Sequence, residues 1–331
     1  MSKKTKIWLI TAFCLILAGS ITFAGVMTVL EWDFSKLSTV KYETKTYEIS
    51  DSFGDISILT DTADIDLVPS EDGACRVVCH EDIKAPHLVE VADSGLEIKL
   101  KNNKKWYEHI GINIGTPRIT VYLPEGEYGA LTVKESTGDI QISDKFSFAS
   151  IDIKVRTGSV RSYASAQGDI KIKTTTGGIN IENISASALE LRTTTGRINA
   201  HGVSCDGDIY IGVTTGRAAL TDITCNNLKS QGDTGGITMK DLVAAGKLII
   251  ERDTGSVCFE DCDAAELDIK TVTGSVKGSL LTEKVFIAKS DTGRIRVPES
   301  ITGGKCKIET DTGNIKITLS EDKNFEVYGN E

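Results

Sequence analysis

Hydrophobic and polar positions along most of this chain repeat with a period of 19 or 20 residues. Residues six before and three after a recurring Thr-Gly are apolar in all ten units, and those four before are apolar in nine. A pattern this regular indicates a repeat architecture. The ten units have their Thr at positions 137, 157, 176, 195, 215, 234, 254, 273, 292 and 312.

Each unit is expected to contain two short strands joined by a turn. Side chains alternate faces along a strand, so inward positions on one strand are an even number of residues apart. The step from four residues before the Thr to three after it is seven, which requires a turn at the Thr-Gly. Glycine accepts positive φ without steric cost. The expected turn glycines are Gly138, Gly158, Gly177, Gly196, Gly216, Gly235, Gly255, Gly274, Gly293 and Gly313.

Two all-β architectures can be built from this unit. In a β-solenoid (β-helix), about ten coils stack about 4.8 Å apart and bury their apolar positions against one another. In a β-propeller, two units would form each four-stranded blade, and alternate units should differ. The units show no such alternation, which favours an all-β solenoid over residues 129–319.

The remaining segments are expected to flank this solenoid. Residues 31–50 are polar and are interpreted as a juxtamembrane segment. Residues 51–128 contain irregularly spaced strand patterns and degenerate coils, which predict an N-terminal β cap over the open end of the stack. Residues 320–331 form a polar tail.

The uncharged segment 7–30 predicts one transmembrane helix. Its 24 residues would span about 36 Å as a helix, enough to cross a hydrocarbon core of about 30 Å. Three lysines lie in residues 1–6, so the positive-inside rule predicts a cytoplasmic N-terminus and an extracellular C-terminal domain. A cleaved signal peptide is the alternative, but the segment is longer than a usual signal core and lacks a following Ala-x-Ala site.

Composition excludes several classes of function. The 331 residues carry 47 acidic and 37 basic side chains, a net charge of -10, which argues against binding of nucleic acid. The sequence contains neither the Cys-x-x-Cys spacing typical of zinc sites nor the Gly-Gly-x-Gly-x-Asp repeat of calcium-binding β-rolls. Neither a metal nor a cofactor is therefore expected.

One segment is the candidate binding site. Residues 99–117 are the only stretch in which aromatic and positive side chains concentrate along the sequence. Such a segment can stack on a sugar or dock a partner, and the alternative is that it covers the apolar end of the solenoid. Its central residues are Lys104, Lys105, Trp106, Tyr107 and His109.

Catalytic residues are not apparent. The sequence places none of its four histidines beside an obvious nucleophile, so no catalytic triad is expected. A polysaccharide-acting β-helix hydrolase or lyase is the alternative class. It would need a cleft built by long loops, and a period of 19 or 20 residues leaves no room for them.

Three features together resemble the bacterial putative adhesin family, a domain-of-unknown-function family of β-strand repeat proteins. They are KWYEHIGINI at residues 105–114, ITVYLP at residues 119–124, and the Thr-Gly-[Asp/Ser/Arg]-[Ile/Val] turns. The resemblance covers about residues 45–319 and implies a β-helical domain at the bacterial surface, with no family catalytic residue to carry over. Together with the membrane span, it predicts a non-enzymatic, single-pass adhesin or envelope binding or sensing protein. Its partner would be an envelope glycan or a surface or membrane protein.

Overall fold

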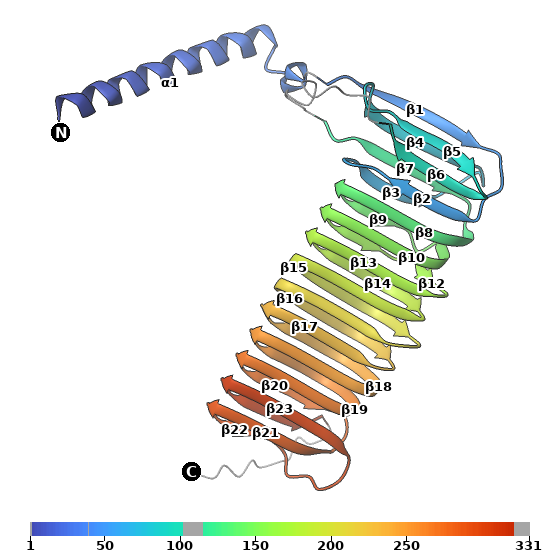
Figure 1. Ribbon diagram of the computed structural model, residues 1–331, viewed down its shortest axis with the longest axis vertical. Coiled ribbons are helices and arrows are strands. Elements are labelled where there is room, and N and C mark those ends of the chain that lie inside the picture. Colours follow the sequence, from blue (N-terminus) through green and yellow to red (C-terminus); the bar gives the residue numbers. More distant parts are fainter. Residues whose placement is uncertain (1, 39, 102–114, 321–331) are drawn as a thin grey trace.

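The computed structural model describes residues 2–38, 40–101 and 115–320 (Figure 1). Helix α1 covers Lys3–Val29, and the 3-10 helix η1 covers Phe34–Leu37. The strands before the repeats are β1 (Tyr42–Ile49), β2 (Asp55–Leu59), β3 (Asp64–Pro69), β4 (Cys75–Asp82), β5 (His87–Ala92), β6 (Gly95–Leu100) and β7 (Arg118–Leu123). The first half of the repeats contains β8 (Gly126–Thr137), β9 (Ile140–Ile142), β10 (Phe146–Thr157), β11 (Val160–Ser162), β12 (Ser165–Ala166), β13 (Asp169–Thr176), β14 (Ile179–Ala186) and β15 (Ala188–Cys205). The second half contains β16 (Ile209–Cys225), β17 (Leu228–Thr234), β18 (Ile237–Thr254), β19 (Val257–Thr273), β20 (Val276–Leu280), β21 (Lys284–Thr292), β22 (Ile295–Arg296), β23 (Gly304–Thr312) and β24 (Ile315–Leu319).

Strands of neighbouring coils pair in parallel and in register. On one wall, Ile151 in β10 lies between Leu131 in β8 and Ile170 in β13. On the other wall, Val160 in β11 pairs with β9 and β14 in the same way. Equivalent apolar positions therefore stack into continuous buried columns. The β-solenoid predicted from the sequence is confirmed.

The Thr-Gly turns stack so closely that they leave no room for a side chain. A Cβ atom on Gly177 would lie 1.9 Å from the carbonyl oxygen of Gly158 in the neighbouring coil, and one on Gly216 would lie 1.6 Å from that of Gly196. The φ angles of Gly177 and Gly216 are also positive, at 146° and 142°. At Gly177 and Gly216, glycine is therefore needed both for the backbone conformation and for the close approach of the next coil.

The end of the solenoid nearest α1 is covered by a cap of β1 and β4–β7 (Figure 1). Strands β2 and β3 form a coil that pairs with β8 and β9, and β6 and β7 extend its two walls in parallel. The outer strands β1, β4 and β5 pair antiparallel, which ends the parallel stack. Strand β1 lies within residues 31–50, so part of the segment expected to be a polar juxtamembrane linker belongs to the cap.

The last two coils stack out of chain order (Figure 1). Strand β23 pairs with β19, placing Cys306 opposite Leu267, and β21 pairs with the other side of β23, placing Phe286 opposite Cys306. On the second wall, β24 lies between β20 and β22. The coil that comes last in the sequence is therefore second from the end in space.

One inward position carries a buried cation. Arg252 is 3 % exposed and donates to Ser230 Oγ at 2.7 Å and to the carbonyl oxygen of Glu251 at 2.8 Å. Gly232 in the neighbouring coil leaves room for the guanidinium of Arg252, because a Cβ at residue 232 would lie 3.2 Å from Arg252 Nη1. Burial lowers the pKa of Arg252 to about 10. Ser230 is the single polar residue in the column of positions four before each Thr. Its buried hydroxyl is satisfied by the hydrogen bond from Arg252.

Helix α1 is long and apolar enough to cross a membrane. A signal sequence near an N-terminus would share the same length and composition. In Figure 1 the helix extends away from the cap end of the solenoid.

Candidate functional site

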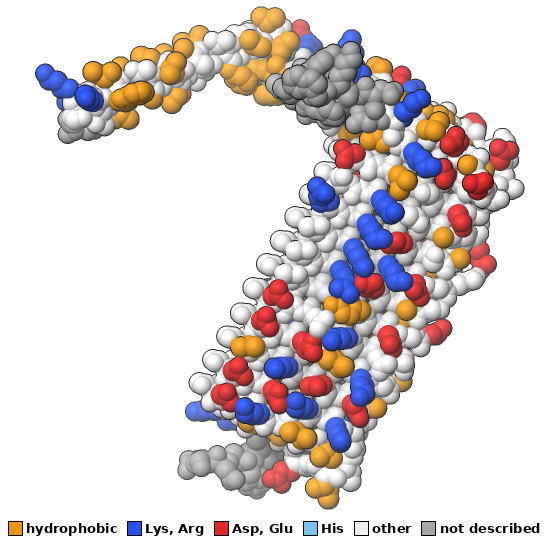
Figure 2. Space-filling view, in the orientation of Figure 1, with side chains coloured by type: hydrophobic (Ala, Val, Ile, Leu, Met, Phe, Trp, Pro, Cys, Tyr) orange, Lys and Arg blue, Asp and Glu red, His pale blue; other side chains and the backbone are white. Residues whose placement is uncertain are grey.

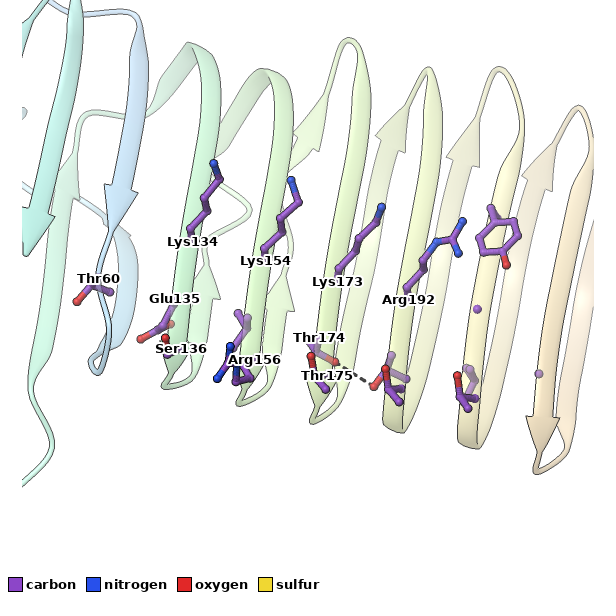
Figure 3. Close-up of a pocket in the computed structure, with 18 of the residues that line it drawn as sticks. Thr60, Lys134, Glu135, Ser136, Lys154, Arg156, Lys173, Thr174, Thr175 and Arg192 are labelled. Carbon is purple, nitrogen blue, oxygen red and sulfur yellow. Dashed lines mark hydrogen bonds between the residues drawn. The ribbon is translucent and has the colours of Figure 1, made fainter.

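Four basic side chains form a row on one wall of the solenoid, next to the cap. They are the residues three before the Thr in four successive units, and they lie opposite one another in β8, β10, β13 and β15. Because neighbouring strands lie about 4.8 Å apart, the row places four positive charges along about 14 Å. This basic row consists of Lys134, Lys154, Lys173 and Arg192, which Figure 3 shows side by side. In Figure 2, Lys and Arg side chains gather along the solenoid below the cap.

The basic row forms one side of an open groove with a volume of about 1080 Å³. Residues just before each Thr, among them Ser136, Arg156 and Thr175, form the other side (Figure 3). Buried residues two before each Thr lie between the two sides. The groove runs across the coils from Thr60 beside the cap to Asp233.

Carboxylates balance part of the positive charge of the row. Lys154 Nζ lies 2.8 Å from Asp152 Oδ2, and Lys173 Nζ lies 3.0 Å from Glu190 Oε1, which Arg192 also contacts. Burial acts to raise the pKa of Glu190, but hydrogen bonds from Lys173 and Arg192 outweigh it and lower that pKa. The cations of these pairs are solvent-exposed and each pair contributes little, so a ligand anion can compete for them.

The two ends of the row differ in character. At the far end, the Arg192 guanidinium lies 4.1 Å from the centroid of the Tyr210 ring, and the Tyr210 hydroxyl donates to Gln231 Oε1 at 2.9 Å. A ring held in this way offers a surface on which a sugar can stack. At the cap end, Lys134 has no ion pair among the described residues, so its charge is the most available.

The cap end of the groove also holds a buried carboxyl group. Glu135 is 6 % exposed, and its Oε1 accepts a hydrogen bond from the Ala63 N–H at 3.0 Å. Within the described part of the chain its Oε2 has no hydrogen-bond partner. Burial, aided by repulsion from nearby aspartates, raises the pKa of Glu135 to about 8. Near neutral pH it is therefore mostly an uncharged acid that can donate a hydrogen bond.

We expect Glu135→Gln to stabilise the protein at alkaline pH. The pKa of Glu135 is about 8 in the folded protein against an ordinary value of 4.5, so its stabilising contribution is complete below pH 4.5 and is lost as the pH rises to about 8. The amide removes this loss, which should raise the free energy of unfolding at pH 8 by about 1–3 kcal/mol. Urea unfolding at several pH values measures the difference. Glu127→Gln, an exposed acid on the same strand, is the control; a wild-type pH slope in Glu135→Gln would contradict the assignment.

Comparison with known protein families identifies the chain. The family model described as Toastrack DUF4097 matches residues 53–216 and 204–330. The chain belongs to the Toastrack DUF4097 family. This membership, like the structures described next, confirms the resemblance found in the sequence. No curated protein matches this Toastrack chain.

Solved structures share the Toastrack solenoid. A putative adhesin from Parabacteroides distasonis ATCC 8503 has a TM-score of 0.50 and 12 % identity, with 84 % of this chain and 98 % of that chain covered. A putative adhesin from Parabacteroides merdae ATCC 43184 has a TM-score of 0.51 and 16 % identity, with 73 % and 97 % covered. At these identities the likeness concerns the fold.

A second cluster of polar side chains lies inside the cap of this Toastrack protein. His87 is 4 % exposed, and its Nε2 lies 2.9 Å from Thr60 Oγ1 while its Nδ1 lies 2.8 Å from Glu81 Oε2. The sequence places no histidine beside an obvious nucleophile, but the fold brings the His87 ring to the hydroxyl of Thr60. The antiparallel strands of the cap bring His87 to the end of β2. These strands lie outside the 19- or 20-residue repeats, so the repeat pattern could not predict this contact. Glu81 is fully buried, so the network belongs to the cap interior.

The predicted binding segment lies outside the described residues. Its members fall within residues 102–114, and they are Lys104, Lys105, Trp106, Tyr107 and His109. The fold gathers a second group of positive and aromatic side chains, because the basic row and Tyr210 come together on the wall of the Toastrack solenoid. The basic row is visible in the sequence, because four successive units carry a basic residue three positions before the Thr. It was missed because each is separated from the next by a whole repeat.

Proposed function

We propose that this chain is a non-enzymatic, adhesin-like protein that binds an anionic polymer in the groove beside the cap. The basic row carries the proposal, because it holds four cations in register along an open surface. A polymer with carboxylate or phosphate groups at regular intervals can pair with several of them at once, which compensates for the weakness of each exposed pair. Tyr210 and the threonine hydroxyls add stacking and hydrogen bonding for sugar rings.

The proposal places the groove outside the cell on a chain anchored by α1. Lys3, Lys4 and Lys6 precede the helix and favour a cytoplasmic N-terminus. Because α1 joins the cap (Figure 1), the groove then lies at the end of the solenoid nearer the membrane, which favours a polymer of the cell's own envelope. N-terminal sequencing of the protein from membranes tests the anchor: a chain that begins after residue 30 would identify a cleaved signal instead.

Neutralising the basic row is expected to weaken polymer binding about 10- to 100-fold. The triple variant Lys134→Gln, Lys154→Gln, Lys173→Gln removes three cations, each worth roughly 0.5–1 kcal/mol in an exposed pair. The full-length protein in detergent is tested by biolayer interferometry against polygalacturonate and poly(glycerol phosphate), which separate carboxylate from phosphate recognition. Dextran serves as the uncharged polymer.

A matched variant distinguishes the groove from net charge. Lys240→Gln, Lys247→Gln, Lys270→Gln removes the same charge from positions outside the groove. It should keep wild-type affinity apart from a small general loss. Equal weakening in both triple variants would assign binding to net charge, and unchanged affinity in the groove variant would refute the proposed site.

Cleavage of a bound polysaccharide is the second candidate function. One observation favours it: Glu135, with its pKa raised to about 8, and Asp61 line the same groove. Glycoside hydrolysis uses two carboxyl groups, one of them protonated as the general acid. Release of new reducing ends from polygalacturonate in the binding assay, abolished in Glu135→Gln, would support this function. Binding without release supports the adhesin-like function.

A further inference from the structure

We propose that the cap contains a Zn²⁺ site formed by Cys79, Glu81 and His87. The Cys79 sulfur, a Glu81 carboxylate oxygen and a His87 ring nitrogen lie within 4.8 Å of one another. Cys79 and Glu81 are two residues apart on the inward face of β4, and His87 begins β5. All three residues are buried, so the three donors converge in a closed interior.

The donor set is the kind that zinc prefers. A thiolate, an imidazole and a carboxylate bind Zn²⁺ at about 2.0–2.3 Å, whereas Ca²⁺ and Mg²⁺ favour sets made of oxygen alone. Tetrahedral ligation needs ligand atoms about 3–4 Å apart. The 2.8 Å contact between His87 Nδ1 and Glu81 Oε2 must therefore widen slightly, and the Cys79 sulfur, which lies within 4.8 Å of the other two donors, must lie in the same range. With three protein ligands, a water would take the fourth position.

The surroundings of the three residues also match those of a metal site. Histidines that bind metal through one ring nitrogen commonly use the other for a hydrogen bond that fixes the ring. His87 has this arrangement, because its Nε2 lies 2.9 Å from Thr60 Oγ1 while Nδ1 faces Glu81. Cys79 is a free cysteine whose side chain is fully buried beside the other two donors. A bound cation would supply the charge that a buried thiolate needs.

The position of the site suggests its role in the fold. Strand β4 pairs with β1 and β7 on one wall of the cap, and β5 pairs with β6 on the other wall. A metal held by Cys79, Glu81 and His87 would join the two walls where the parallel stack ends. Structural zinc contributes its binding free energy to folding, so this site would stabilise the cap. The sequence spacing Cys-x-Glu-x5-His differs from Cys-x-x-Cys, which is why the sequence predicts no metal.

Cobalt binding tests the site directly. The full-length protein in detergent, stripped with a chelator, is titrated with Co²⁺, which gives a thiolate-to-cobalt charge-transfer absorption when a cysteine is a ligand. We expect one equivalent of Co²⁺, displaced by Zn²⁺. Cys79→Ser should lose the charge-transfer absorption, whereas Cys262→Ser, another buried cysteine outside the cluster, should retain it. Thr60→Val keeps all three ligands and should weaken cobalt binding by about 10- to 100-fold.

Each outcome bears on the proposal. Failure to bind either metal, or a charge-transfer absorption that survives in Cys79→Ser, overturns it. If Cys79→Ser does not fold by circular dichroism, Thr60→Val decides, because unchanged cobalt affinity would show that the Thr60–His87 hydrogen bond does not support a metal ligand. Polymer binding in the groove is measured separately with the basic-row variants, so failure of one site does not imply failure of the other.

Discussion

Replacing Gly177 with alanine is expected to lower the free energy of unfolding by about 3 kcal/mol or more. The added Cβ would lie 1.9 Å from the carbonyl oxygen of Gly158 and 2.6 Å from its carbonyl carbon, at a φ of 146°. Both contacts are with backbone, so no side-chain rotation relieves them. The coil must move away from its neighbour, which weakens the packing and the parallel hydrogen bonds of the adjacent coils.

Gly178 provides the control from the same turn. A Cβ on Gly178 would meet its nearest atom, the Arg197 carbonyl oxygen, at an ordinary 3.5 Å. Gly178→Ala should therefore change the free energy of unfolding by less than about 1 kcal/mol. Urea unfolding of the full-length protein, followed by circular dichroism, compares the two variants. Similar losses in both would show that the close stacking of Thr-Gly turns is not what the fold requires of Gly177.

The regular part of the fold was predictable because one physical rule repeats ten times. Alternating side chains and the odd step across each Thr-Gly determine two strands and a turn, and they also place residues such as Leu131, Ile151 and Ile170 in one column. The close approach that excludes a Cβ at Gly177 was not predictable in this way. It depends on the distance between coils and not on the phase of residues within one coil.

Contacts that involve residues outside the repeats could not be predicted from the sequence. The cluster of Thr60, Glu81 and His87 depends on the antiparallel register of the cap, for which no repeat gives a reference. The basic row could have been found, since its members share one phase of successive units. Arg252 illustrates coupling between coils, because its burial depends on Ser230 and Gly232 in the neighbouring unit.

Removing the last coil is expected to release the one before it. Strand β21 pairs with β23, and β22 pairs with β24, so a chain ending at Pro298 loses the strands on which β21 and β22 stack. If the coils were stacked in chain order, β21 would instead pair with β19 and would keep its neighbour after the truncation. The out-of-order stacking therefore makes residues 284–296 dependent on residues 304–319.

Amide hydrogen exchange with mass spectrometry measures this dependence. In a chain of residues 1–298, peptides from 284–296 should exchange as fast as an unstructured segment, because unpaired terminal strands have little local stability. A chain of residues 1–320 is the control, and its β21 amides should stay protected by β23. Peptides from β15 and β16 should remain protected in both chains, because stability in a solenoid is carried largely by neighbouring coils. Protection of β21 in the 1–298 chain would instead mean that it can pair directly with β19.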